Sequence, residues 1–294
     1  MTAVGGYTPV RLMHRHMAKK VAIRADSPNP KSKMKFPFYW VDAFASQVFT
    51  GNPAGVVPLE QWLDDALMQR IAFENGLAET AFFVPIGPGR YSLRWFTPGA
   101  EVDLCGHATV ATAFVLFTRM GFTGDRITFD SRSGPLHVRR LPDGKIELDF
   151  PARPAVPVAP PAALLKGLGA TPAYYAQAQA NLAVFNTVAE VRALRPDFAT
   201  LATLEQYGTI VTAPGEDCDF VSRFFAPRVG VPEDAVTGSA HCVLTPYWTR
   251  RLGKTLLHAR QISPRGGELW CELAGDRVKI AGHAVLYLRG EIHV

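Results

Sequence analysis

The chain has 294 residues, and 48% of them are apolar, which is the composition of an ordinary globular protein with a full-sized core. No apolar run approaches the length of a membrane span, so an integral membrane protein is not expected. The four cysteines follow no Cys-x-x-Cys spacing and nothing resembles a secretory signal, which predicts free thiols and a cytoplasmic location.

The formal net charge of +5 is concentrated at the start of the chain. Residues 1–36 contain eight basic residues against the single acid Asp26, whereas the remainder holds 23 basic and 25 acidic residues. A mildly acidic body offers no basic stripe for a phosphate backbone, so no nucleic-acid partner is expected. We interpret residues 1–35 as a basic N-terminal extension that takes no part in the chemistry.

The first part of the chain predicts strands around one amphipathic helix. Aromatic and β-branched residues from Phe36 onward are typical of a strand, which leads to the turn Gly51-Asn52-Pro53. Residues 61–76 carry apolar side chains at helical spacing and stop at Gly76, a usual helix terminator. Further strand candidates lie at residues 91–96, 126–131, 135–140 and 145–150.

An acidic residue, Glu79, interrupts the strand-like segment that follows this helix. Its sequence neighbours include Leu77, Phe82 and Phe83. A carboxylate in apolar surroundings loses solvation, so we expect its pKa to be raised, which suits proton transfer near neutral pH. The alternative is that Glu79 faces solvent or pairs with an arginine.

Residues 107–119 predict a helix without a polar face, because only three threonines interrupt its apolar side chains. A helix that is apolar all round is buried, and this one is too short to span a bilayer. Its first free N–H groups, at Gly106 and His107, then point into the protein interior. There they need an anion or another polar partner.

A second copy of this arrangement lies at residues 233–248. Glu101 precedes Gly106 by five residues, and Glu233 precedes Gly238 by the same interval. The residues beside the glycines correspond as well, Cys105 to Thr237 and His107 to Ser239. Two similar halves that each present a buried helix N-terminus suggest one carboxylate-type ligand clamped between two lobes.

A run rich in proline and alanine, residues 151–161, predicts the lobe boundary. We expect an N-terminal lobe of residues 36–151, completed by residues 282–294, and a C-terminal lobe of residues 152–281. The second lobe has helical patterns near 161–168 and 187–206, and strand candidates at 174–179, 181–186, 208–213, 268–273 and 277–281. Strands in runs around single buried helices predict an α+β fold.

Several short motifs, in this order, resemble the phenazine-biosynthesis isomerase (PhzF-like) family, which has the diaminopimelate epimerase fold. The motifs are Gly51-Asn52-Pro53, Glu79-Thr80-Ala81-Phe82, Trp95-Phe96-Thr97-Pro98, Glu101 to Thr109, Glu233-Asp234, Thr237 to His241 and Ser263 to Gly267. They are specific as a set, although each alone is weak. The resemblance covers residues 36–294.

The resemblance implies two lobes, each a barrel-like, mostly antiparallel sheet around a central helix, with the active site between them. It implies proton transfer without a cofactor or a metal, acting on a small carboxylate-bearing metabolite, in a homodimer. Glu79 would be the general base and acid, assisted by His107, Asp234 and Ser239. The implied substrate-binding residues are Asn52, Cys105, Gly106, Thr237, Gly238, Arg265 and Gly266.

One departure narrows the expected reaction. Diaminopimelate epimerases use two facing cysteines, but Thr237 stands where the second thiol is needed, so two-thiol racemisation is not expected. An amino- or hydroxy-acid epimerase that uses Cys105 remains an alternative, and so does a binding protein without turnover. Near the second helix, His241 and Cys242 lack a third ligand at metal spacing, so we expect them to pack in the core. For Arg265, pairing with a substrate anion and ordinary solvation are both open.

Overall fold

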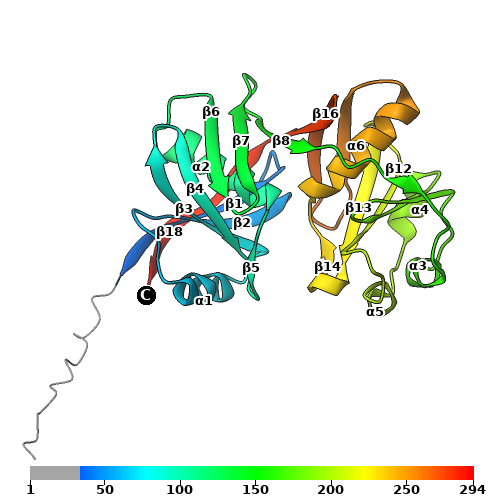
Figure 1. The fold of residues 1–294 in the computed structure, drawn as a ribbon, viewed down its shortest axis with the longest axis horizontal. Helices are drawn as coiled ribbons and strands as arrows, with labels where there is room; N and C mark the ends of the chain where they lie inside the picture. Colours follow the sequence, from blue (N-terminus) through cyan, green and yellow to red (C-terminus); the bar gives the residue numbers. More distant parts are fainter. Residues whose placement is uncertain (1–33) are drawn as a thin grey trace, which may run out of the picture. The chain divides into compact units, whose positions relative to one another are not determined.

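A computed structural model describes residues 34–294, and residues Lys35–Val294 form one compact unit with an α+β fold, as predicted. The predicted basic extension falls almost entirely on residues outside this range. Among the described residues, no helix is both long and apolar enough to cross a membrane. Figure 1 shows one group of strands around helix α2 (Gly106–Arg119) and a second group around helix α6 (Gly238–Leu252).

The first group is the N-terminal lobe. Its elements are β1 (Lys35–Ala43), β2 (Asn52–Pro58), α1 (Asp65–Asn75), β3 (Glu79–Gly87), β4 (Arg90–Phe96), β5 (Glu101–Val102), α2, β6 (Arg126–Ser131), β7 (Gly134–Arg140) and β8 (Ile146–Pro151). β1 pairs antiparallel with β2, β2 parallel with β3, and β3 antiparallel with β4. β4 then pairs parallel with β6, which leads into the antiparallel β6–β7–β8 meander.

The second group is the C-terminal lobe. Its elements are β9 (Val156–Pro157), α3 (Ala162–Leu168), β10 (Tyr174–Gln177), β11 (Asn181–Val184), α4 (Val188–Ala193), α5 (Phe198–Leu201), β12 (Thr209–Pro214), β13 (Phe220–Ala226), the 3₁₀ turn η1 (Pro227–Val229), β14 (Val231–Asp234), α6, β15 (Leu256–Gln261), β16 (Gly267–Ala274) and β17 (Arg277–Gly282). The pairing senses repeat those of the first lobe. β10–β11 is antiparallel, β11–β12 parallel, β12–β13 antiparallel and β13–β15 parallel.

A matching ion pair marks the same point in both lobes. The Arg94 guanidinium on β4 donates two hydrogen bonds to Glu101 on β5, with distances of 2.7 and 2.8 Å. The Arg223 guanidinium on β13 does the same to Glu233 on β14, at 2.8 and 2.9 Å. Each pair fixes the strand that leads into a central helix. The repeat deduced from the spacing of the two glutamates is therefore present in the structure.

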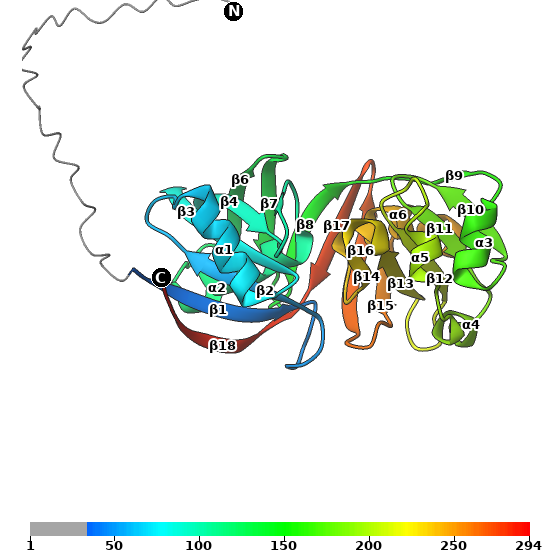
Figure 2. The ribbon, with the colours of Figure 1, turned by 90° about the horizontal axis from the view of Figure 1, so that it is seen from below.

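The two lobes are joined by continuous sheet. β8 pairs antiparallel with β17, and the last strand, β18 (Ala284–His293), pairs antiparallel with β1 (Figure 2). The tail thus lies against the N-terminal lobe. The exact lobe limits remain a prediction.

Helix α2 can be buried because its threonine hydroxyls form hydrogen bonds within the helix. Each of its three threonines donates its hydroxyl to the carbonyl oxygen four residues earlier, at 2.6 to 2.7 Å. The N-terminal lobe covers most of the resulting apolar surface, whereas Thr118 and Arg119 at the end of the helix are exposed. The first turn, which contains His107, is buried as well.

One expectation about the second lobe was wrong, and strand β15 was not predicted. The continuous helix near 187–206 is two short helices, since Pro196 excludes the residue before it from helical geometry. Thr187 and Asp197 each cap a separate start. Strand β15 was missed, because the side chains that it buries include the small Ala259 and the polar Gln261 beside Leu257, a weak apolar alternation.

Candidate active site

A cleft of about 660 Å³ lies between the two lobes. It is lined by the starts of helices α2 and α6, by the start of β3 and by the end of β14. The predicted residues that line it are Glu79, Cys105, Gly106, His107, Asp234, Thr237, Gly238 and Ser239. Apolar side chains, among them Phe150 and Phe224, form much of the remaining wall.

The N-termini of α2 and α6 meet in this cleft at two glycines. A Cβ atom built on Gly106 would lie 3.9 Å from the Cα atom of Gly238. The residues before the helices, Cys105 and Thr237, make no side-chain capping hydrogen bond. Free N–H groups of both helices are therefore concentrated at one place, where they favour negative charge.

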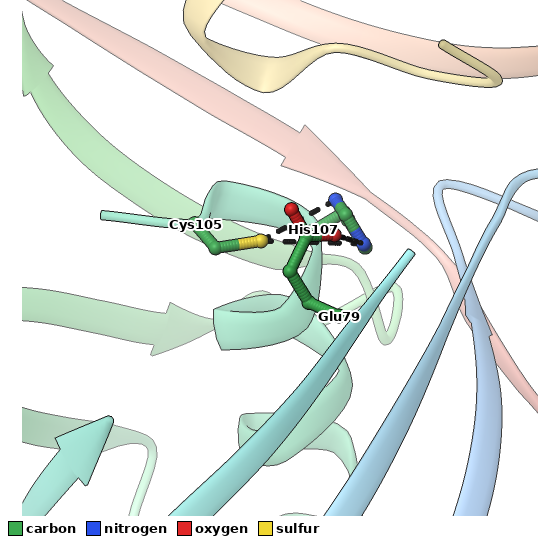
Figure 3. Close-up of side chains that lie close together, drawn as sticks. All are labelled: Glu79, Cys105 and His107. Carbon is green, nitrogen blue, oxygen red and sulfur yellow. Dashed lines mark hydrogen bonds and ion pairs between the residues drawn. The ribbon is translucent and has the colours of Figure 1, made fainter. Parts of the chain in front are cut away.

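The side chains of Glu79, His107 and Cys105 form a cluster in the N-terminal lobe wall (Figure 3). Nε2 of His107 lies 3.1 Å from Oε2 of Glu79, and Nδ1 of the same ring lies 3.5 Å from Sγ of Cys105. Cys105 and His107 are buried, whereas the Glu79 side chain is 18% exposed. Among the described residues, no group donates a well-directed hydrogen bond to Oε2 of Glu79, although this oxygen is itself buried.

The expected rise in the pKa of Glu79 was wrong. Burial acts to raise this pKa, but the charge of His107, together with polar contacts from His107 and Cys105, outweighs burial and holds the pKa of Glu79 below its ordinary value. Burial alone would lower the pKa of His107, yet Cys105 and Glu79 raise that pKa well above its ordinary value. The pair therefore favours a carboxylate beside an imidazolium. Glu79 neither faces open solvent nor pairs with an arginine.

The Cys105 thiol has a raised pKa. Its causes are burial first and the Glu79 charge second, and they outweigh the opposing effect of His107. Ligand atoms of Glu79, Cys105 and His107 all lie within 4.8 Å of one another, and in the part of the chain that the structure describes these three side chains have the spacing to hold a metal ion.

Asp234 is fixed in the cleft by donors from both lobes. Nδ2 of Asn52, in the N-terminal lobe, donates to Oδ1 of Asp234 at 2.7 Å, and the Thr237 hydroxyl donates to Oδ2 at 2.6 Å. The Gln261 amide braces this corner by donating to the Asp234 carbonyl oxygen and accepting from the Thr237 N–H. Burial raises the pKa of Asp234 in spite of the opposing charge of His107.

Ser239 lies in the opposite wall, within 3.2 Å of the Tyr207 hydroxyl. Sequence reasoning missed Tyr207 and also the cleft residues Arg153 and Gln179. Each stands alone in a segment between elements, without a recognisable pattern around it. Only the fold brings them to the helix ends.

The structure does not bring Asn52, Arg265 and Gly266 to the cleft lining. Nε of Arg265 donates to the Gly51 carbonyl oxygen at 2.8 Å, and Nη2 contacts the buried Asp42 carboxylate at 2.9 Å. Arg265 and Gly266 instead line a separate hollow of about 470 Å³. Arg265 is neither solvated on its own nor turned toward the helix ends, but ties the turn between β15 and β16 to the N-terminal lobe.

Two similar lobes with facing helix N-termini and an acid at the cleft between them are the arrangement that the resemblance to the PhzF-like family implies. Residues 41–290 match the family described as phenazine biosynthesis-like protein (PhzC-PhzF), and the chain belongs to this family. A protein of Pseudomonas aeruginosa named an uncharacterized isomerase is 53% identical over 262 residues, which cover 89% of this chain and 100% of the relative. A human phenazine biosynthesis-like domain-containing protein is 41% identical, with 88% of this chain and 99% of that protein covered.

Solved structures agree with this assignment. A PhzF-family protein of Enterococcus faecalis is 46% identical, has a TM-score of 0.86, and is matched over 89% of this chain and 100% of its own. A hydroxyproline epimerase of Agrobacterium vitis, 11% identical with a TM-score of 0.58 over 88% of this chain and 93% of its own, shares the fold alone. The chain is thus an isomerase of the PhzF-like family.

Proposed function

We propose that the protein moves a proton between two carbon atoms of a small carboxylate-bearing metabolite, without a cofactor, and that Glu79 carries the proton. The observation that supports this most directly is the buried Oε2 atom of Glu79. Glu79 lines the cleft, and this oxygen lies 3.1 Å from Nε2 of His107 without a well-directed hydrogen bond from any described residue.

The proton-transfer step follows from this arrangement. The Glu79 carboxylate takes a proton from a C–H bond that a neighbouring unsaturated group has made acidic, and the electron pair of that bond is delocalised into the substrate. The protonated Glu79 then returns the proton to another carbon of the same system. The base is regenerated, so that no oxidant or second reactant is needed.

The two helix N-termini provide what the intermediate needs. N–H groups at the starts of α2 and α6 stabilise the substrate carboxylate and the negative charge that develops after proton removal. The His107 imidazolium keeps Glu79 ionised before the step. Asp234, whose pKa burial raises above its ordinary value, is a polar partner for the substrate between the two helix ends.

The test is deuterium incorporation in heavy water, followed by mass spectrometry, into a panel of small amino, hydroxy and cyclohexadiene carboxylic acids. Wild type is expected to label one compound class, and Glu79→Gln is expected to lose this labelling. Glu147→Gln, on the outer face of β8 where Glu147 pairs with Arg139, is the matched control. Labelling that persists in Glu79→Gln would exclude Glu79 as the base.

A second candidate is an epimerase of an amino or hydroxy acid in which Cys105 takes part. The 3.5 Å contact between Sγ of Cys105 and Nδ1 of His107 favours it, since an imidazole in this position can exchange a proton with the thiol. Cys105→Ser separates the two reactions. It abolishes labelling in the epimerase, whereas in the isomerase labelling persists at a rate comparable with that of wild type.

A further inference from the structure

Glu79, Cys105 and His107 offer three different metal-ligating atoms to one point of the cleft. Thiolate, imidazole and carboxylate are the ligand types of protein zinc sites. Binding here would displace the protons of the Cys105 thiol and the His107 imidazolium to solvent. We propose that these three side chains bind Zn²⁺ and that the bound ion inhibits the enzyme. The inhibition rests on the function proposed above, but the binding does not. Zinc is here a regulator of the site, since the proposed proton transfer needs no metal.

The distances between the three side chains suit a tetrahedral ion. With the usual bond lengths to zinc, neighbouring sulfur and nitrogen ligands lie about 3.5 Å apart, and nitrogen and oxygen ligands about 3.3 Å apart. Sγ of Cys105 lies 4.0 Å from Nε2 of His107, and this nitrogen lies 3.1 Å from Oε2 of Glu79. Small side-chain rotations remove differences of about half an ångström.

The positions of the three ligands favour binding. Cys105 and His107 flank Gly106 at the start of α2, and Glu79 begins β3, so regular elements hold all three in place. The buried Oε2 atom of Glu79 has no well-directed hydrogen bond from described residues, so an ion would replace only its 3.1 Å ion-pair contact with His107. The cleft gives the ion a way in and leaves space for a water molecule as fourth ligand, as in zinc sites with three protein ligands.

Bound zinc blocks proton transfer for a direct reason. A Glu79 carboxylate bound to zinc donates electron density to the ion and is therefore a weaker base. The ion also occupies the space next to the helix ends, where the substrate carboxylate is expected. Zinc and substrate therefore compete.

The experiment measures Zn²⁺ binding to the full-length protein by competition with a chromophoric chelator, and Co²⁺ binding by the near-ultraviolet thiolate-to-cobalt absorption. Wild type is expected to bind one ion with thiolate absorption. Cys105→Ser is expected to lose this absorption and to bind zinc at least about tenfold more weakly, and Glu79→Gln to bind zinc more weakly as well. Thermal unfolding without metal establishes that both variants are folded.

Two controls separate this site from other ligands. Cys218→Ser changes a half-buried thiol outside the cleft, and a His14→Ala/His16→Ala variant removes two imidazoles that lie outside the described residues. Both are expected to bind zinc as wild type does. The proposal would be overturned if Cys105→Ser bound zinc as tightly as wild type, or if either control variant lost zinc binding. If zinc binds at this cluster but does not slow deuterium exchange, the proposed inhibition is wrong and the proposed binding site is retained.

Discussion

Nε2 of His107, the second residue of α2, lies 3.1 Å from Oε2 of Glu79, the first residue of β3. This contact decides the protonation state of the buried acid. Without the imidazole, burial raises the pKa of a carboxyl group and leaves it protonated more often. With it, the pKa of Glu79 falls below its ordinary value of 4.5. The base is therefore in its active form before substrate arrives.

The pH profile of deuterium exchange tests this coupling. Exchange requires ionised Glu79, so kcat/KM falls as pH falls through the pKa of Glu79, which His107 lowers. His107→Gln removes the charge, and burial then moves the acid limb of the profile to higher pH. His258→Gln, a histidine stacked on Trp270 outside the cleft, is the control and leaves the limb in place. An unchanged acid limb in His107→Gln would show that His107 does not set this pKa.

Gly106→Ala tests the space between the two helix ends. The added methyl group makes ordinary contacts, 3.7 Å to Leu148 and 3.9 Å to the Cα atom of Gly238, so the protein is expected to fold with a stability within about 1 kcal/mol of wild type. The methyl group projects where both sets of N–H groups converge, and we expect KM to rise about tenfold or more. Gly87→Ala, at an open position at the end of β3, is the matched control. Identical kinetics for Gly106→Ala and wild type would argue against an anion site here.

Asn52→Ala tests how the lobes position Asp234. The buried Asn52 amide donates to Oδ1 of Asp234 and to the Val236 carbonyl oxygen, so its removal leaves two acceptors without this donor. We expect a loss of about 1–3 kcal/mol in the free energy of unfolding and a lower kcat. Denaturant unfolding and exchange kinetics measure the two effects, with the exposed Asn186→Ala as control. Wild-type values for both quantities would show that this inter-lobe contact is dispensable.

We expect the folded protein to lose stability in acid because the pKa of the buried His241 is low. Burial lowers its pKa from 6.5 to about 4 in the folded protein, although its hydrogen bond to the Thr237 carbonyl oxygen opposes this. The unfolded chain therefore binds the proton more tightly, and the stabilising contribution of neutral His241 is lost as pH falls from about 6.5 to about 4. The loss amounts to about 3 kcal/mol over this window.

Unfolding in urea at a series of pH values checks this. His241→Asn keeps a donor toward Thr237 but does not titrate, so its free energy of unfolding depends less steeply on pH in this window. Equal slopes for the variant and wild type would assign the acid sensitivity to other groups.

The positions of α2 and α6 were predictable because an apolar helix with a glycine at its start leaves few arrangements. The duplication was visible too, because Glu101 and Glu233 stand at equal distances from Gly106 and Gly238. The arginines that bind these glutamates come from β4 and β13. Their roles are set by sheet register, which the spacing of motifs does not contain.

The direction of the pKa shift of Glu79 could not be predicted from the sequence. Apolar neighbours of Glu79 along the chain predict a raised pKa, but its closest partner in space is His107 from the next helix. In the same way, Arg265 in a glycine-rich turn suggests an anion site in the sequence. In the structure its guanidinium instead pairs with the buried carboxylate of Asp42. In both cases, contacts between segments that are distant in the sequence determine the environment of the charged side chain.

The most direct test of the central claim compares Glu79→Gln with wild type for a compound that wild type labels in heavy water. If Glu79 carries the proton, the exchange rate falls by about 10²–10⁴-fold in the variant, while the dissociation constant of the compound changes by less than about threefold. Exchange at the wild-type rate in a folded Glu79→Gln variant would contradict the account and assign the proton transfer to another group in the cleft.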